Sequence, residues 1–358
     1  LFKMATLAEK LGVFDKKINY KDTETIIALA EFVTTSVVTK DLLNDLLPIA
    51  AKKVLKANVT KQELVNANVD YEYEVECLKA FLNAISSELQ NVTLSDVNTM
   101  LTKEFLLAVS SAGKELETSK LAKLFMKRIM KKAINKVSST TNVLDFMLSS
   151  LDSPLYTDDY AMADYMSLLN VIEEAAYINF FGSEGLDYAN LDGHIDILLT
   201  NLFGMYAVEG HEEEVMRMVL DKLTFVDTSS LDLTVVNDWD NEFAQFVLMT
   251  KSLATLCADP EFDINNMNSS MFENETIQDK FVAFVDAASK SYVGSELFKE
   301  LYETKVEANL PEDAQGIIDL DTLPNEKWAE EFEKLFDVYV SVKQGLNNLS
   351  LNEALSVY

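Results

Sequence analysis

The chain has 358 residues, of which 48% are hydrophobic and 25% are charged, with a formal net charge of −29 at pH 7. This globular composition provides ample core, while 10 glycines and 5 prolines are too few for a chain of β-hairpins. The acidity argues against nucleic acid as a ligand, because neutralisation of phosphates dominates that affinity. No apolar run approaches the roughly 20 residues of a membrane-spanning helix, so we predict no transmembrane segment.

An amphipathic helix pattern recurs along the chain. Apolar side chains spaced +4, +3, +4, +3, +4 lie on one stripe of an α-helix. The full ladder occurs three times in the same phase, and two shorter copies keep part of it. A helix pattern that recurs at long intervals indicates an internal repeat. In chain order the ladders are Asp22, Ile26, Leu29, Val33; Tyr71, Val75, Leu78, Leu82, Ile85, Leu89; Ala161, Tyr165, Leu168, Ile172, Ala175; Trp239, Phe243, Phe246, Thr250, Leu253, Cys257; and Trp328, Phe332, Leu335, Tyr339, Val342, Leu346.

Two further helices are predicted after each of the three middle ladders. The third helices that follow the Asp22, Tyr71 and Trp239 ladders open in a similar way, with a hydroxyl residue followed by leucine, at Thr39, Ser119 and Ser295. The segment Leu231–Val236 has the composition of a strand, but we expect a short connector there. The predicted second and third helices are 95–111 and 118–136, then 192–206 and 212–223, then 274–289 and 295–306.

These elements predict an all-α fold, a tandem array of divergent three-helix units that is either α-solenoid-like or a set of chained helical bundles. The predicted units are a partial unit 1–66, full units 67–157, 158–234 and 235–323, and the first helix of another unit at 324–358. Because the chain begins at Leu1 and the last unit stops within or just after its first helix, we expect a fragment of a longer array. The alternative is a single irregular helical domain whose internal similarities are coincidental.

An acidic residue stands three positions into four of the ladders, at Glu74, Asp164, Glu242 and Glu331. An acid in the first turn faces the positive end of its own helix dipole. This placement favours Asp70, and either Asn237 or Asp238, as helix N-caps.

Charge is segregated along the sequence. Residues 1–137 carry 20 basic and 17 acidic side chains, whereas the remainder carries 10 and 42. The basic side chains of the 118–136 helix are candidates for contact with an acidic partner or with the acidic part of a second copy, head to tail. The alternative is that these side chains extend over neighbouring helices and contact no partner. The candidates are Lys120, Lys123, Lys127, Arg128, Lys131, Lys132 and Lys136.

The sequence offers little for catalysis. It contains no glycine-rich phosphate loop and no nucleophile elbow, and we predict no catalytic residue, cofactor site or metal site. Cys77 and Cys257 lie on apolar helix faces, so we expect buried, unpaired thiols. His194 and His211 complete no zinc-ligand spacing and are interpreted as solvated or helix-capping residues.

Two acidic loops are candidates for calcium binding. The segment Tyr188–Asp196 places Asn190, Asp192 and Asp196 at EF-hand spacing around Gly193, but lacks the first Asp and the bidentate Glu. The loop 259–266, which contains Asp259 and Asp263, could also gather oxygen ligands. Calcium is therefore a weakly supported possible partner.

Two function classes remain. The first is a non-enzymatic structural, adhesive or assembly module that is a fragment of a longer microbial surface protein. For this class we expect a cell-surface or extracellular location. The second is an intracellular helical-repeat scaffold that binds basic peptides or proteins on an acidic face. The expected partner is a protein or a second copy of the chain.

Overall fold

The computed structural model describes residues 40–54, 58–91, 102–141, 144–182, 185–268, 270–307 and 318–346, with a few positions between 24 and 31. Every regular element in these ranges is a helix and none is a strand, so the predicted all-α fold is confirmed. The strand-like segment Leu231–Val236 contains only a short 3-10 turn, η4 (Leu233–Val235), as expected for a connector.

The chain divides into two compact units. The first contains the chain up to Ala176 together with the segment Gly204–Gly210, and the second contains Tyr177–Phe203 and the chain from His211 onward. The boundary lies inside the helix of the Ala161 ladder, α9 (Asp158–Ile178). This division is coarser than the five units predicted from the sequence, which stay a prediction.

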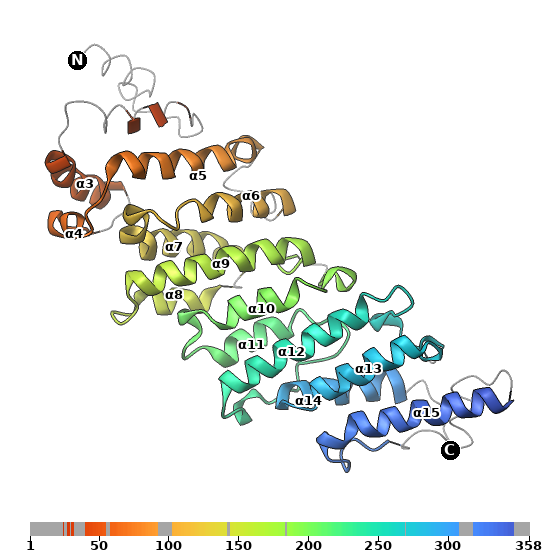
Figure 1. The fold of residues 1–358 in the computed structure, drawn as a ribbon. Helices are drawn as coiled ribbons and strands as arrows, with labels where there is room; N and C mark the ends of the chain where they lie inside the picture. The colour runs from red at the N-terminus through yellow and green to blue at the C-terminus, as the bar shows by residue number, and fades with distance from the viewer. Residues whose placement is uncertain are drawn as a thin grey trace. The chain divides into compact units, whose positions relative to one another are not determined.

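The first unit is built of helices packed in pairs (Figure 1). In the described residues, α3 packs on α4, α5 on α6, and α7 on α8. The close approach of α6 to α9 depends on Gly113, because a Cβ there would lie 2.6 Å from Cδ2 of Leu169. Ahead of α9, these helices are α3 (Lys40–Val54), α4 (Lys61–Asn66), α5 (Tyr71–Asn91), α6 (Lys103–Lys114), α7 (Lys120–Thr141) and α8 (Asp145–Asp152).

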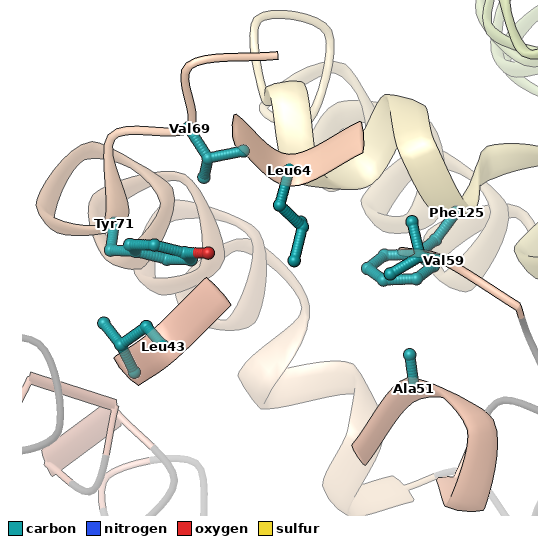
Figure 2. Packing of buried hydrophobic residues seen from close by; sticks show 7 residues of the cluster. All are labelled: Leu43, Ala51, Val59, Leu64, Val69, Tyr71 and Phe125. Atoms are coloured by element: carbon teal, nitrogen blue, oxygen red, sulfur yellow. The ribbon is translucent and has the colours of Figure 1, made fainter. Parts of the chain in front are cut away.

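A hydrophobic cluster joins α3, α4, α5 and α7 (Figure 2). Its centre is the fully buried Leu64, which Figure 2 shows between Tyr71 on one side and Val59 with Phe125 on the other. The capping box of Thr60 and Glu63 starts α4 and so positions Leu64. Tyr71 leads the first full ladder, and its hydroxyl donates a hydrogen bond to Oδ1 of Asn44 (2.6 Å). The ladder thus anchors the core of the first unit.

The second unit is also built of packed helices (Figure 1), and its core contains many buried aromatic side chains. In the described residues, α10 packs on α12, α12 on α13 and α14, and α13 on α15. Its α-helices are α10 (Ile195–Phe203), α11 (Glu212–Leu220), α12 (Trp239–Cys257), α13 (Glu275–Ala288), α14 (Tyr292–Leu301) and α15 (Trp328–Leu346). Its other elements are the 3-10 turns η2 (Tyr188–Asn190), η4, η5 (Ile264–Asn266), η6 (Met271–Glu273) and η9 (Asn325–Lys327), and a π-helical turn, η7 (Tyr302–Val306).

Aromatic rings from α13, α14 and α15 form the centre of this core. Phe281 and Phe298 each meet Phe332 edge to face, with ring centroids 5.5 and 5.6 Å apart. Trp328 is fully buried, and its Nε1 donates to the carbonyl of Leu323 (3.1 Å). Each such ring pair contributes about 0.5–1.5 kcal/mol beyond burial alone.

The ladder residues lie on the buried faces of their helices, as predicted. In the four ladders from Tyr71 onward, every described ladder side chain is buried or half-buried. Three helices begin at the predicted leading residue, Tyr71, Trp239 and Trp328. The Asp22–Val33 ladder lies outside the described residues, as do the side chains of Leu89, Tyr339, Val342 and Leu346.

Some predicted helix starts were wrong. The helix predicted from residue 192, α10, begins at Ile195. The third helix of the 235–323 unit begins at Tyr292, after the N-cap Ser291, and not at Ser295. The extended backbone of Ser291 allows its Oγ to accept the amide of Gly294 (3.0 Å), whereas Ser295 is buried inside the helix. Only Ser295 is followed closely by a leucine, as the sequence pattern requires, but the backbone conformation places the N-cap at Ser291.

Candidate functional site

The basic helix α7 is held in place by its apolar face. Phe125, Met126, Met130 and Ile134 are all buried in the first unit. The basic side chains leave the helix on other faces, where the sequence alone gives them no partner. Their surroundings therefore decide whether they are available to another molecule.

Lys127 has partners within its own unit. Its Nζ donates to the backbone carbonyls of Ser153 (2.8 Å) and Tyr156 (2.9 Å), and it lies 5.8 Å from the centroid of the Tyr156 ring. Ser153 is the C-cap of α8 and Tyr156 lies in the connection to α9, so the lysine satisfies carbonyls in the segment that joins these two helices. This is a structural role.

Three more of the candidate lysines also have partners inside the first unit. Lys123 pairs with Asp159 and Lys131 pairs with Asp152, while Nζ of Lys120 donates to the carbonyl of Asn68 (3.4 Å). Arg128 is half-buried and Lys132 is exposed, and the side chain of Lys136 lies outside the described residues. The predicted contact surface stays a prediction, with four of its seven members engaged internally.

The sequence did not predict the contacts of the ladder acids, the acidic residues three positions into each ladder (Glu74, Asp164, Glu242 and Glu331). Glu74 on α5 is 7% exposed. Its Oε1 accepts the backbone amides of Lys120 (2.9 Å) and Leu121 (3.2 Å), and its Oε2 accepts the hydroxyl of Ser119. Lys120 and Leu121 are the first two residues of α7, so Glu74 binds the start of a helix distant in sequence.

Glu242 makes the equivalent contacts in the second unit. It is 5% exposed on α12. Its Oε2 accepts the amide of Tyr292 (3.1 Å) and its Oε1 accepts the amide of Val293 (2.8 Å). These are the first two residues of α14, and the Ser291 N-cap corresponds to Ser119 at the start of α7.

Asp164 repeats the arrangement with a shorter element. It is 1% exposed on α9, and its two oxygens accept the amides of Tyr206 (2.7 Å) and Ala207 (2.8 Å). These residues begin η3 (Tyr206–Val208). The hydroxyl of Tyr156 donates a third hydrogen bond, to Oδ2 (2.6 Å). We call each of these three arrangements a carboxylate joint: a buried ladder acid that accepts the first two amides of a later helical element.

Asp70 and Asp238 cap their helices as predicted, and Glu74 and Glu242 lie in the first turns of α5 and α12, whereas α9 begins at Asp158, ahead of the first turn predicted for Asp164. The partners of the three buried acids were not predicted, because each carboxylate accepts amides of another helical element. The first amides of a helix have no intrahelical acceptor and carry partial positive charge. A carboxylate placed there gives these amides an acceptor, and the amides give the buried carboxylate its hydrogen-bond donors.

Burial and hydrogen bonding act in opposite directions on Asp164. Burial raises the pKa of this carboxyl, and the hydrogen bonds from Tyr156 and from the amides of Ala207 and Tyr206 lower it, leaving a net increase. Burial, and then the bond to Asp164, raises the pKa of the Tyr156 hydroxyl. The arrangement suits a fixed structural contact.

The same joint explains why Gly204–Gly210 belongs to the first unit. Besides the two amides bound by Asp164, the carbonyl of Ala207 accepts the hydroxyl of Ser150 on α8 (3.0 Å). The rings of Tyr160 and Tyr206 stack with centroids 4.1 Å apart. These contacts hold the segment to α8 and α9.

The predicted calcium loops gain no support. In the 188–196 segment, Oδ1 of Asp192 accepts from Thr255 and Oδ2 of Asp196 pairs with Nζ of Lys251 (3.0 Å), while Oδ1 of Asp196 is buried without a hydrogen-bond partner. In the second loop, Asp263 accepts the amide of Asn265 and the side chain of Asn266, and Asp259 pairs with Lys280. Within the described residues, no three His, Cys, Asp or Glu side chains form a group that could hold a metal ion.

The remaining candidate residues have packing or capping positions. Cys77 and Cys257 are buried free thiols, as predicted, and burial raises the pKa of Cys257 to about 12. The ring of His194 stacks on Tyr177 with centroids 4.6 Å apart. His211 is the N-cap residue of α11, and its Nδ1 lies 3.1 Å from Oε2 of Glu214.

An apolar cavity lies beside the first joint. It has a volume of about 620 Å³, and Glu74 and Ser119 are among its lining residues, with Leu43, Val75 and Phe125. Ala30 also lines it, so the chain ahead of α3 forms part of its wall.

Comparison with protein-family models, with curated proteins and with solved structures finds no match to this chain. Of the helices that the structure describes, none is both long enough and apolar enough to cross a lipid bilayer.

Proposed function

We propose that this chain is a non-enzymatic structural, adhesive or assembly module made of chained three-helix units, and part of a longer microbial surface protein. The observation that carries the proposal is the recurrence of the carboxylate joint at Glu74, Asp164 and Glu242, at the same position of three successive ladders. A recurring contact at a recurring sequence position supports descent of the units from a common building block.

The carboxylate joint suits a building block that must keep its shape under mechanical force. It ties the first helix of a unit to the start of a later helical element through two charge-assisted hydrogen bonds in a buried setting. Such bonds have fixed geometry, and breaking them leaves a buried charge and unpaired amides. A unit closed in this way would keep its shape when neighbours pull on it or dock against it.

The location is tested by labelling intact cells of the organism that encodes the chain with a membrane-impermeant, amine-reactive biotin reagent. The proposal predicts that the protein is recovered in the labelled fraction while a cytosolic marker is not. Complete protection of the protein, with labelling only after lysis, would overturn the surface assignment and favour an intracellular role.

A second candidate function is an intracellular scaffold for basic peptides. The charge of the chain favours it, because the residues after 137 carry 42 acidic and only 10 basic side chains. The test is fluorescence anisotropy of a labelled lysine- and arginine-rich peptide. Saturable binding that exceeds that of a scrambled peptide of equal charge would favour the scaffold, whereas equal binding of the two would indicate only non-specific attraction.

A further inference from the structure

Two tyrosine rings stack on each other at the surface of the first unit. The ring centroids of Tyr160 on α9 and Tyr206 in η3 lie 4.1 Å apart, and the ring planes are inclined by 22°. Both side chains are open to solvent, since Tyr160 is 39% and Tyr206 is 48% exposed. Leu155, which is 83% exposed, precedes Tyr156, whose ring meets that of Tyr160 edge to face. An exposed apolar patch of this kind marks a surface for interaction with another molecule.

The carboxylate joint of Asp164 holds both rings in place. Its Oδ1 accepts the backbone amide of Tyr206 (2.7 Å), and Tyr160 lies one turn earlier on the same helix as Asp164. Tyr156, which donates to the same carboxylate, has its ring centroid 6.3 Å from that of Tyr160. Tyrosine rings fixed before binding lose little conformational entropy when a partner docks. The stacked pair is therefore a preorganised contact surface.

Glu209 places a negative charge beside the exposed ring of Tyr206. It is the C-cap residue of η3, and its amide donates to the carbonyl of Tyr206 (3.3 Å). Side chains three residues apart in a 3-10 turn lie on the same side of it, so this carboxylate and this ring face the same way. The side chain of Glu209 is exposed and has no hydrogen bond or ion pair among the described residues. Within eight positions of Tyr206 the chain carries four glutamates and no lysine or arginine.

The basic side chains close to the start of α9 are already engaged. Lys123 and Lys127 act on the charge of Asp158, two positions before Tyr160. Lys123 pairs with Asp159, however, and Lys127 donates to two backbone carbonyls. The charge that remains available around the stacked rings is therefore negative, which favours a cationic partner.

We propose that this surface binds an arginine side chain of a partner protein, with the guanidinium plane on the exposed face of Tyr206 and its charge beside Glu209. Guanidinium groups stack on aromatic faces, and arginine and tyrosine are both enriched at the energetic centres of protein interfaces. Lysine carries the same charge but is more strongly hydrated and has no plane to stack. The inference rests on the proposed role as an adhesive or assembly module and names the chemistry of its partner.

The test is fluorescence anisotropy of two fluorescein-labelled peptides of equal length, titrated with the full chain at physiological salt. One peptide alternates arginine and glycine, and the other alternates lysine and glycine. General attraction to the acidic chain contributes equally to both, because their charges are equal. The arginine peptide should bind about 5–10-fold more tightly, because stacking on the ring adds to the attraction between charges.

Variants of the tyrosines separate the ring contact from charge and packing. Tyr206→Leu keeps an apolar side chain but removes the aromatic face, and it should abolish the preference for arginine. Tyr160→Leu removes the ring that supports Tyr206 and should reduce the preference. Tyr206→Phe keeps the ring and should behave like wild type. Tyr73→Leu, at a tyrosine that is 47% exposed elsewhere in the first unit, is the matched control and should also behave like wild type.

A second pair of variants tests the charge. Glu209→Gln should weaken binding of the arginine peptide more than Glu275→Gln does, although both variants change the net charge equally. Glu275 is an exposed glutamate in the first turn of α13. Circular dichroism confirms that every variant is folded.

Two results would overturn the proposal. One is equal or undetectable binding of the two peptides by the wild-type chain, and the other is a preference for arginine that Tyr206→Leu leaves unchanged. Neither bears on surface labelling of intact cells, so failure of this contact is distinguishable from failure of the proposed function.

Discussion

The carboxylate of Glu242 accepts the backbone amide of Val293, a residue 51 positions later in the chain, at 2.8 Å. The contact ties the first turn of α12 to the first turn of α14, and both ends of it are buried. A carboxylate shielded from water needs such donors, because its desolvation is otherwise uncompensated. The stability of the second unit should therefore depend on this contact between α12 and α14.

Loss of this contact should destabilise the second unit. Glu242→Ala leaves two amides without their acceptor and should lower the free energy of unfolding by roughly 2–4 kcal/mol. Urea denaturation followed by tryptophan fluorescence measures this directly, because both tryptophans, Trp239 and Trp328, lie in the second unit. Asp240→Asn, an exposed acid in the same turn, is the control and should change stability little. Equal effects of the two variants would contradict a special role for Glu242.

Asp164 should hold the segment Gly204–Gly210 in place. Asp164→Asn weakens the contacts to the amides of Tyr206 and Ala207, so chymotrypsin should cleave after Tyr206, which is 48% exposed, roughly tenfold faster. Mass spectrometry of a cleavage time course locates the cut. Tyr156→Phe removes only the hydroxyl contact and should have a smaller effect. Unchanged cleavage in both variants would mean that other contacts hold the segment.

Lys127 and Lys123 should differ although they lie on the same helix. Lys127→Met leaves two carbonyls in the connection between α8 and α9 without their donor and should lower the free energy of unfolding by about 1–3 kcal/mol. Lys123→Met removes an exposed ion pair to Asp159 and should cost less than about 1 kcal/mol. Thermal denaturation by circular dichroism compares the two variants. Full stability of Lys127→Met would return this lysine to the set of candidate partner contacts.

The pair of Asp259 and Lys280 should make the second unit sensitive to acid. The hydrogen bond from Lys280, followed by the amide of Glu261, lowers the pKa of Asp259 in the folded chain. The unfolded chain therefore binds the proton more readily, and this stabilisation is present above the ordinary aspartate pKa of about 3.9 and is lost as pH falls through the lower folded value.

The measurement is the urea midpoint from pH 6 to pH 3, followed by tryptophan fluorescence. Lys280→Gln should flatten the fall in stability over this range, because it removes the main cause of the low pKa of Asp259. The other acids of the chain contribute equally to both proteins, so the difference between the two curves isolates the pair. Superimposable curves would rule out the coupling.

The local part of the fold could be predicted from the sequence. The ladders identified α5, α12 and α15 and their leading residues, because helical periodicity records which side is buried. The burial of Cys77 and Cys257 followed from the same faces. The choice of Ser291 over Ser295 as N-cap did not follow, because it depends on backbone dihedral angles that the sequence pattern leaves open.

The contacts between elements could not be predicted. Glu74 and Glu242 occupy first-turn positions that suit their own helices equally well, and only packing brings a later helix start to each of them. Lys127 bonds to backbone carbonyls, which every residue carries and no sequence motif marks. The available signal was the recurrence of an acid at one ladder position, which indicated an important residue but not its partner.

The central claim is that the three buried ladder acids bind the first amides of later helical elements. Hydrogen exchange of Leu121, Ala207 and Val293 by NMR tests it most directly in the wild-type chain. First-turn amides normally exchange fast because they lack an intrahelical acceptor, and the amide of Glu275, which starts α13 without a described acceptor, is the internal reference. The account predicts strong protection of Leu121, Ala207 and Val293 relative to Glu275, and exchange of all three at the rate of Glu275 would contradict it.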